Sequence, residues 1–374
     1  MPISREPVKP VANPCPHLSS ELYVIGITGT NGKTTVAYLI GEVLKSAGYN
    51  PFVLGTLNSG NNDLSTPESP DISRFMETHL AQKGTHFVME VTSEGIDQDR
   101  IADIEFDLKL LTNITQDHLD YHKTFKIYQN TKLDFMREGP AHKIYPENFA
   151  KEPIDFDTLL LGQFNLLNIK AAAAVLRHMD IPEHHIQNTL SSCVAPRGRL
   201  EAVHNGQRFM VLIDYAHTPD GLQNVLSTAK NIALARNGRL LVMFGCGGNR
   251  DRGKRPVMGK IASEIADLLV ITDDNPRLED SHEIMDEIQN GINTDFHDYI
   301  LIQNRQRAIQ YIIDQAHSRD VVIMAGKGHE TYQILGSKSI HFDDCEQARI
   351  AISNRLKPGV KAIGLIPMNL HLTN

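Results

Sequence analysis

The stretch YVIGITGTNGKTT, Tyr23 to Thr35, decides the fold of the first half of the chain. Residues 23–28 are apolar and partly β-branched, which is typical of a strand buried on both faces. Gly29 and Gly32 follow it and allow backbone N–H groups to converge on an anion. A helix begins near Thr34, so strand, glycine-rich turn and helix come in direct succession. This order predicts a phosphate-binding loop.

Two side chains of the loop carry its chemistry. Lys33 is placed to reach the β- and γ-phosphates of a nucleotide, and the Thr34 hydroxyl is placed to bind Mg²⁺. The helix N-terminus adds partial positive charge. The spacing departs from G-x-x-x-x-G-K-[ST], because Ile27 stands where the first glycine would be. The alternative is a glycine turn with a chance Gly-Lys-Thr. The expected nucleotide contacts are Gly29, Thr30, Asn31, Gly32, Lys33, Thr34 and Thr35.

Length and composition limit the class of protein. A chain of 374 residues with 41% hydrophobic content can form two cores, so two domains are expected. We find neither an apolar run of 18 residues nor a signal peptide, and we expect a cytoplasmic protein that does not contact a membrane. The four cysteines form no C-x-x-C pair, which argues against structural zinc. The net charge of −8 gives no reason to expect nucleic-acid binding.

Strands and helices alternate along the chain, which predicts an α/β fold. We expect a P-loop ATPase-type central domain with a mostly parallel sheet and a C-terminal Rossmann-like α/β domain. The expected parts are an extended leader over 1–20, the central domain over 21–197 and the C-terminal domain over 198–374. Expected strands lie at 23–28, 52–54, 86–91, 107–114, 209–214, 240–244, 268–272 and 321–325, and expected helices at 34–47, 71–82, 125–137 and 164–178.

Polar side chains follow two strands of the first domain. Glu90 ends the strand 86–91, where open α/β sheets bind ligands, and it could hold Mg²⁺ opposite Thr34. The alternative is an acid satisfied by neighbouring N–H groups. The loop after the strand 107–114 gathers four titratable side chains, a costly arrangement unless they face water or a metal. They are Asp117, His118, Asp120 and His122.

TGTNGKTT at 28–35 and TNITQDHLDYH at 112–122 resemble the Mur ligases, and within them the type that adds the third peptide residue in peptidoglycan synthesis. The resemblance implies an ATP-dependent amide ligase that transfers the γ-phosphoryl group to a carboxylate, giving an acyl phosphate that an amine attacks. It implies two Mg²⁺ ions, one of them bound by His118. It also implies a CO₂-derived carbamate on Lys132, whereas the residue alone reads as a lysine on a helix surface. The implied metal-binding residues are Thr34, Glu90, His118 and Lys132.

Further nucleotide contacts follow from the same resemblance. GQFNLLNIKAAAA at 162–174 implies that Asn168 meets the adenine. RGRLE at 197–201 marks the domain junction and implies that Arg199 faces the ATP phosphates. DYAHTPDGL at 214–222 implies that Asp214 and His217 border the nucleotide. The catalytic residues implied are Lys33, His118, Lys132 and Arg199.

Three motifs of the second domain each follow an apolar strand, so they should meet along one sheet edge. They are FGCGGNRDRGKRPVMG, DDNPRLED and AGKGHETYQ. DNPR resembles the signature of enzymes that take meso-diaminopimelate, whose second carboxylate an arginine can grip bidentately. The basic run within 250–255 would otherwise be a solvated loop. The implied contacts to the amino acid are Arg255, Asp274, Asn275, Pro276, Arg277, Gly326 and Glu330.

The acceptor is where the sequence departs from the family. Only 28 residues precede Gly29, whereas the family places a uridine-diphosphate-binding domain there, and the segment between Lys132 and Gly162 is short. We therefore expect a smaller carboxylate acceptor, or one presented by a separate protein that supplies the missing domain. The competing expectation is the muramoyl dipeptide held by its peptide end near Thr66, Ser93 and Arg100. A hypothesis of another class is a catalytically idle paralogue that binds nucleotide and regulates or scaffolds a partner.

Overall fold

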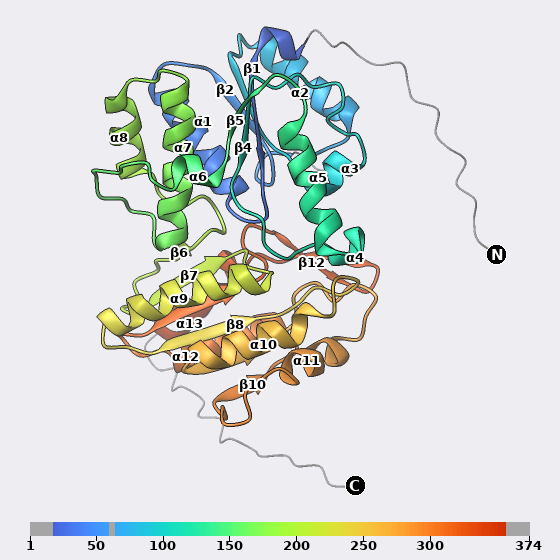
Figure 1. Ribbon diagram of the computed structural model, residues 1–374. Helices are drawn as coiled ribbons and strands as arrows, with labels where there is room; N and C mark the ends of the chain where they lie inside the picture. The colour runs from blue at the N-terminus through green and yellow to red at the C-terminus, as the bar shows by residue number, and fades with distance from the viewer. Residues whose placement is uncertain (1–17, 60–63, 357–374) are drawn as a thin grey trace, which may run out of the picture. The chain divides into compact units, whose positions relative to one another are not determined.

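The computed structural model describes residues 18–59 and 64–356, and the chain divides into two compact units, Met1–Arg197 and Gly198–Asn374 (Figure 1). The leader expected over residues 1–20 lies largely outside the described residues, which begin with a 3₁₀ turn at Ser19–Glu21. In the described part of the chain, no helix is both long and apolar enough to span a membrane.

The first unit is built on a five-stranded sheet whose strand pairs are all parallel. The strand order is β2-β3-β1-β4-β5, which places the strand before the phosphate loop at the centre. β1 aligns Ile25 with Val88 on one side and with Leu108 on the other. The strands are β1 (Tyr23–Thr28), β2 (Pro51–Leu54), β3 (His86–Glu90), β4 (Leu108–Leu111) and β5 (His142–Ile144).

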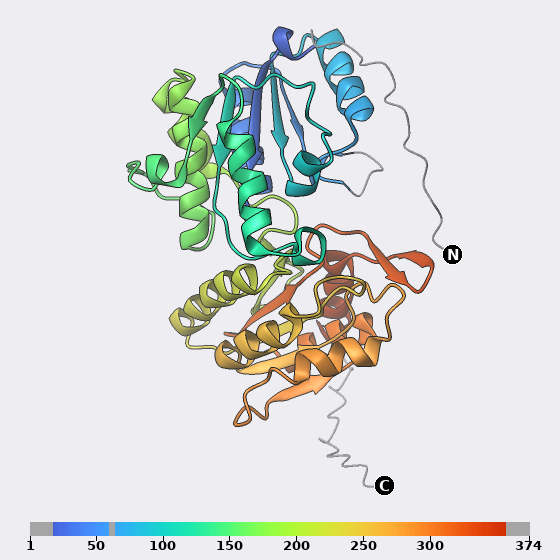
Figure 2. The same cartoon turned by 45° about the vertical axis from the view of Figure 1, so that its right-hand side comes forward.

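Helices cover both faces of this sheet (Figures 1 and 2). The apolar residues of α1 share one buried cluster with α7 and α8, while α2 and α5 contribute to a separate cluster. The helices are α1 (Lys33–Ser46), α2 (Ser69–Ala81), α3 (Ser93–Asp97), α4 (Leu119–His122), α5 (Phe125–Arg137), α6 (Pro146–Phe149), α7 (Gln163–His178) and α8 (Glu183–Ser192).

The second unit is built on a six-stranded sheet of order β10-β9-β8-β11-β7-β6, parallel except for the pair of β6 with β7. Alternate residues of β7, β8 and β11 pack with α12 and α13 in one cluster, and α10 packs beside α9 and α11. A β12–β13 hairpin follows β11. The elements of the second unit are β6 (Glu201–Ala202), β7 (Met210–Asp214), α9 (Pro219–Ala235), β8 (Leu240–Phe244), α10 (Lys254–Ile265), β9 (Leu268–Ile271), α11 (Ser281–Gln289), β10 (Tyr299–Leu301), α12 (Arg305–Gln315), β11 (Val321–Ala325), β12 (Tyr332–Leu335), β13 (Lys338–His341) and α13 (Asp344–Leu356).

The predicted fold class is confirmed, and the strands at 240–244 and 321–325 and the helix at 125–137 have the expected bounds. The strand expected over 107–114 is shorter, Leu108–Leu111. It ends there because the side chains of Thr112 and Asn113 turn to the phosphate loop. It begins late because the Asp107 carboxylate accepts the Val24 N–H at 2.7 Å.

Candidate active site

The phosphate loop joins β1 to α1 through two glycines with positive φ, 143° at Gly29 and 88° at Gly32. The ammonium group of Lys33 folds over the loop and donates to the carbonyl oxygens of Gly29 (2.8 Å) and Thr30 (2.9 Å). The cation therefore lies against the backbone that would surround a phosphate group. The helix N-terminus at Lys33 adds its partial positive charge to the same place.

Two side chains from the end of β4 fix this loop. Thr112 Oγ1 donates to the Asn31 carbonyl at 2.6 Å. The Asn113 side chain donates to the same carbonyl at 3.0 Å and accepts the Asn31 N–H at 3.0 Å. This role was not predicted from the sequence, although Thr112 and Asn113 begin the TNITQDHLDYH motif. The signal was their place directly after β4, the strand that pairs with β1.

The amide of Asn168 packs directly on the loop. Its side chain is 8% exposed and donates to Asn165 Oδ1 at 3.0 Å. A Cβ atom added at Gly32 would lie 2.4 Å from Asn168 Oδ1. Only glycine leaves room for this contact between α7 and the loop, so Asn168 lies beside the phosphate loop. Its implied contact with the adenine stays a prediction.

Oxygen atoms suited to a hard cation gather around Glu90, which is 2% exposed at the end of β3. Thr34 Oγ1 donates to Glu90 Oε2 at 3.0 Å. Thr56, which was not predicted as a site residue, donates its N–H to Glu90 Oε1 at 2.8 Å and its hydroxyl to Oε2 at 3.2 Å. Thr34 and Glu90, expected to hold one Mg²⁺ ion, are thus brought together. Across the described residues no group of three or more His, Cys, Asp or Glu forms a metal site.

Lys132 is buried, with 1% of its surface exposed, so the interpretation of it as a surface lysine is wrong. Its amine lies 3.0 Å from the Gly29 carbonyl oxygen and 3.5 Å from Thr28 Oγ1. Burial lowers the pKa of this amine well below its usual value, and the nearby charge of Lys33 lowers it further. Lys132 of α5 therefore brings a readily deprotonated amine to the phosphate loop.

His118 lies in a cluster of charged groups at the start of α4. Its Nδ1 is 2.8 Å from Glu94 Oε1, and its Nε2 is 3.3 Å from Asp117 Oδ2. Burial alone would lower the pKa of His118, but the hydrogen bond with Glu94 and the charge of Asp117 raise it. Burial would raise the pKa of Glu94, yet the bond with His118 lowers it to about 2. Asp120, by contrast, is exposed, and His122 is buried.

The residues expected near the acceptor surround the carboxyl end of β3. Thr66 Oγ1 donates to the Glu90 carbonyl at 3.0 Å and accepts the Thr92 N–H at 2.9 Å. Arg100 Nη1 donates to the Thr66 carbonyl at 2.8 Å. Ser93 follows Thr92 and is buried, and its Oγ has no hydrogen-bond partner within the described residues. The structure brings Thr66, Ser93 and Arg100 to one place beside Glu90.

The nucleotide residues expected in the second unit lie at the end of β7. The Asp214 carboxylate accepts the N–H groups of Leu200 and Ala216, both at 2.7 Å. Burial raises the pKa of Asp214 to about 6, against the opposing charge of Arg199. The Arg199 guanidinium lies over the Tyr215 ring at 4.6 Å. His217 Nδ1 is 3.0 Å from the Tyr215 carbonyl oxygen.

The three motifs of the second unit follow β8, β9 and β11, which are adjacent in the sheet, so the expected common edge is confirmed. Asn275 Nδ2 donates to Glu330 Oε2 at 2.9 Å. Lys327, fully buried, donates to the same carboxylate at 2.9 Å and to Asn275 Oδ1 at 3.3 Å. A Cβ atom at Gly326 would lie 2.7 Å from Asp274 Oδ2. Lys327 was missed, although it stands inside the AGKGHETYQ motif.

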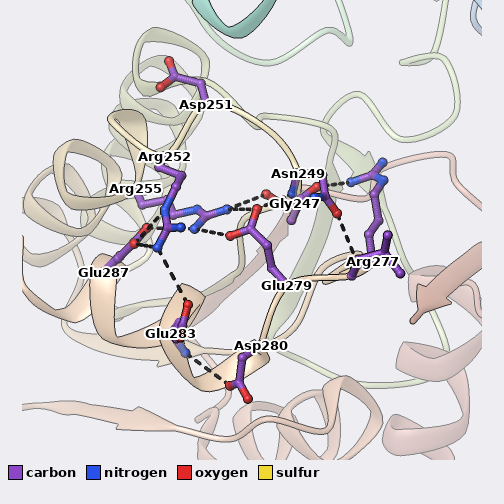
Figure 3. A network of polar contacts seen from close by, with 12 residues as sticks. Gly247, Asn249, Asp251, Arg252, Arg255, Arg277, Glu279, Asp280, Glu283 and Glu287 are labelled. Carbon is purple, nitrogen blue, oxygen red and sulfur yellow. Dashed lines mark hydrogen bonds and ion pairs between the residues drawn. The ribbon is translucent and has the colours of Figure 1, made fainter. Parts of the chain in front are cut away.

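Arg277 is held beside the loop that follows β8 (Figure 3). Its backbone has a φ of 54°, and its Nη1 donates to the Gly248 carbonyl at 3.0 Å. The Pro276 carbonyl is close to the same loop, because a Cβ atom at Gly248 would lie 1.8 Å from that oxygen. The DNPR turn and the loop after β8 therefore pack tightly against each other.

Arg255, which the resemblance implied as a contact to the amino acid, has several hydrogen-bond partners within the protein. Its side chain is fully buried, and Nη1 donates to Glu279 at 2.9 Å and to Glu287 at 2.7 Å (Figure 3). Its Nη2 donates to the Gly247 carbonyl at 3.2 Å. Both Nη groups of Arg255 are thus committed to partners within the protein. The arginine joins α10, α11 and the loop after β8, and Arg252 also contacts Glu287.

Known proteins resemble the chain in both units. A profile of the Mur ligase middle domain matches residues 27–148, and one of the Mur ligase glutamate ligase domain matches residues 198–328. A UDP-N-acetylmuramoyl-L-alanyl-D-glutamate–2,6-diaminopimelate ligase of Clostridium botulinum is 36% identical over 384 aligned residues, which cover 89% of this chain and 78% of the relative. The enzyme of that name from Geobacillus thermodenitrificans is 37% identical, covering 89% and 79%.

Solved structures give the same result. A UDP-N-acetylmuramoyl-L-alanyl-D-glutamate–2,6-diaminopimelate ligase is 27% identical with a TM-score of 0.55, covering 89% of this chain and 79% of that one. A pseudomurein peptide ligase type C from Methanothermus fervidus, 18% identical with a TM-score of 0.64 and the same coverage, shows the shared fold. With more than a third of the residues identical along most of such relatives, the chain belongs to the Mur ligase family of ATP-dependent amide ligases.

Proposed function

We propose that this protein joins a diamino acid, meso-diaminopimelate, to a carboxylate acceptor by way of an acyl phosphate. The observation that supports catalysis most directly is the buried Lys132 amine, 3.0 Å from the carbonyl oxygen of Gly29 in the phosphate loop. A module that only bound nucleotide would gain nothing from an amine desolvated at that position. Relatives of more than 35% identity carry the name of diaminopimelate ligases, which supports the choice of amino acid.

In this proposal the first unit binds ATP and activates the acceptor. The backbone of residues 29–35 surrounds the phosphates, and Lys33 exchanges its loop carbonyls for phosphate oxygens. Thr34 and Glu90 hold one Mg²⁺ ion and His118 contributes to a second. Bound Mg²⁺ neutralises charge on the phosphates during transfer. The close oxygens of Thr34 and Glu90 fit a hard cation.

Lys132 would serve as a carbamate. Its neutral amine bonds the carbon of CO₂ and gives up a proton to water, which leaves an anionic oxygen ligand where an ammonium group would repel a metal. The lowered pKa supports this assignment, because only the unprotonated amine is a nucleophile. The full burial of the side chain would protect the carbamate from hydrolysis.

In the second unit the loops after β9 and β11 would hold the amino acid. Arg277 would pair with the distal carboxylate, and Asn275 and Glu330 would contact the same distal centre, where the Glu330 carboxylate suits the amino group. Their contact with each other and with Lys327 supports a common site. Asp274, Pro276 and Gly326 shape it. We assign Arg255 a supporting role in place of a direct contact, because both its Nη groups already bind Glu279, Glu287 and Gly247.

The remaining nucleotide contacts and the acceptor complete the proposal. Arg199, Asp214 and His217 would meet the nucleotide from the second unit. Thr66, Ser93 and Arg100 would hold the acceptor by its peptide or carboxylate end. Because all the proposed contacts reach the peptide or carboxylate end of the acceptor, we propose that the KM for the acceptor depends only weakly on any nucleotide-sugar part. A separate protein that presents the acceptor is the second possibility.

Phosphate release by the purified chain with ATP and a panel of carboxylates and amino acids tests the proposal. We expect turnover with meso-diaminopimelate and an acceptor that ends in a D-glutamyl or similar carboxylate. Phosphate release at background for every combination would support the idle paralogue instead. Kinetics of UDP-muramoyl dipeptide against the bare dipeptide test the acceptor: a large KM advantage for the UDP form would contradict the proposed weak dependence.

A further inference from the structure

A buried arginine, Arg305, lies beneath the edge of the second sheet where the loops proposed to hold the amino acid begin. The side chains of Arg305 and of its partner Asp344 are both fully buried. Arg305 Nε donates to Asp344 Oδ1 at 2.8 Å and Nη2 to Oδ2 at 2.6 Å, a bidentate pair. A buried pair of this kind contributes little net stability, so its presence calls for another explanation.

The remaining N–H groups of Arg305 reach two strand ends. Nη1 donates to the Asp273 carbonyl at 3.1 Å, and Nη2 donates to the Ala325 carbonyl at 3.2 Å. Asp273 immediately precedes the Asp274–Arg277 turn, and Ala325 immediately precedes Gly326. These two segments follow β9 and β11, which are not neighbours, because β8 lies between them in the sheet. Arg305 therefore joins the starts of both loops across an intervening strand.

We propose that Arg305, neutralised by Asp344, is a positioning residue that sets the distance between the two loops holding the diamino acid. The inference rests on the proposed function. Asn275 and Glu330 come from these two loops and contact each other at 2.9 Å, so their relative placement depends on where each loop begins. Arg305 itself touches no substrate, since its partners are two carbonyl oxygens and a carboxylate within the protein. Its effect must pass through the loops.

The test uses a double variant, Arg305→Met with Asp344→Leu. It removes both charges together, and replacing a buried ion pair by apolar groups of similar volume is often neutral for stability. The single change Arg305→Lys is the second variant, because an ammonium group keeps the charge but lacks the planar fork that serves three partners. The matched control is Arg236→Met. Arg236 also joins two chain segments through the carbonyls of Arg208 and Arg319, which lie at the other ends of β7 and β11.

We expect the folded double variant to raise the KM for diaminopimelate by about tenfold or more and to lower its preference over lysine, because misplacement by a fraction of an ångström is costly in a preorganised site. The KM for ATP should stay within about twofold of the wild-type value. A general loss of packing would not raise the KM for one substrate and spare that for the other. Amide hydrogen exchange should quicken at Asp273 and Gly326 in the same variant. Arg236→Met should leave all three readouts unchanged.

Wild-type KM and wild-type exchange in the folded double variant would overturn the inference. If the double variant does not fold, the same measurements are made on Arg305→Lys. An unchanged KM for diaminopimelate in that variant then overturns the inference. Hydrogen exchange separates this inference from the proposed function. If the wild type uses no amino acid at all, faster exchange at Asp273 and Gly326 still supports the tie between the loops, while unchanged exchange refutes it.

Discussion

At the scale of single residues, two lysine side chains donate hydrogen bonds to one carbonyl oxygen. The amines of Lys33 and Lys132 both lie within 3.0 Å of the Gly29 oxygen, yet only Lys132 is fully buried. Desolvation and the like charge of Lys33 both lower the pKa of Lys132, which favours its neutral form. The resemblance implied a carbamate on Lys132, but the burial that favours its neutral amine could not be predicted from the residues themselves. Nothing in the helix pattern at 125–137 identified which face meets the loop.

Lys132→Ala should be inactive, because the proposed carbamate oxygens are lost with the side chain. Added formate or acetate should restore part of the turnover by occupying the space the carbamate leaves. Steady-state phosphate release with and without the carboxylate measures this. The control is Lys126→Ala on the exposed side of the same helix, which should keep wild-type turnover. Full activity together with an unmodified Lys132 amine in a high-resolution map would exclude the carbamate.

Arg277→Ala should narrow the preference for diaminopimelate over lysine. The bidentate pair with a distal carboxylate should be worth several kcal/mol in a closed site, and lysine offers no such carboxylate, so the wild type should discriminate by orders of magnitude. The ratio of kcat/KM values for the two amino acids measures this. Equal use of both by the wild-type protein would refute the assignment of Arg277.

Asp214 should make stability depend on pH in an unusual direction. Burial raises its pKa from the ordinary value of 3.8 to about 6. Between these two pH values the folded state therefore holds a proton that the unfolded state has released. Its stabilising contribution is therefore complete below about pH 4 and is lost as the pH rises through about 6, a change of roughly 2 to 3 kcal/mol. Urea unfolding of the wild type and Asp214→Asn across this range isolates the contribution as their difference. A difference in unfolding free energy that stays constant from pH 4 to 7 would contradict the prediction.

At the scale of elements, both sheets carry candidate site residues at the carboxyl ends of parallel strands, where open α/β sheets bind ligands. Strong apolar runs such as 240–244 and 321–325 could be predicted to the residue, because buried parallel strands leave a plain pattern. The edge strand β5 and the hairpin strand β13 could not, since β13 is exposed throughout and its sequence KSIH has no apolar alternation. The pairing of Arg255 with Glu279 and Glu287 was also beyond prediction, because it joins separate helices and loops.

Gly198 allows the chain to enter the second unit against the loop after β11. Its φ is +67°, and a Cβ atom there would lie 2.1 Å from the His329 backbone nitrogen. Gly198→Ala should therefore displace the loop that carries Glu330 and raise the KM for the amino acid, with a loss of stability of roughly 1 to 3 kcal/mol. Gly206→Ala is the matched control. Gly206 has a φ of +85°, but its nearest neighbour, a side-chain carbon of Leu356, would be 3.6 Å away.

Comparison of the two glycine variants separates clash from backbone strain. Both replace a glycine of positive φ, so thermal unfolding should show a common destabilisation from strain alone. Only Gly198→Ala should also alter kinetics with the amino acid. Equal effects of the two changes on both measurements would show that the loop after β11 tolerates the added atom.

At the scale of the whole molecule, the proposed ligands are divided between two compact units. The main proposed nucleotide contacts, around Lys33, belong to the first unit, and the proposed amino-acid contacts, around Arg277, belong to the second. The two-domain organisation was a natural expectation from length, and the alternation of strands and helices gave the class of both. What composition could not supply was the content of each site, such as Thr112 and Asn113 holding the loop or Lys327 between Asn275 and Glu330.

Stabilisation by the nucleotide should depend on residues of the first unit, and stabilisation by the amino acid on residues of the second. ATP with Mg²⁺ at about 100 times its Kd should stabilise the wild type by roughly 2.7 kcal/mol, and diaminopimelate should do so independently. Lys33→Ala should abolish the rise in Tm with nucleotide but keep the rise with amino acid, and Arg277→Ala should do the reverse. Thermal unfolding with each ligand measures this. Loss of both responses in either variant would contradict the division.

The order of the helices in the first unit has a consequence for synthesis. The buried face of α1, at residues 33–46, packs against α7 and α8, which end at residue 192. A nascent chain must therefore carry an uncovered apolar helix until that point has left the ribosome. At about 5–20 residues per second, the delay is about 7–30 s, an interval in which a chaperone could bind α1. Because each unit is continuous in sequence, the first can close its core while the second is still being translated.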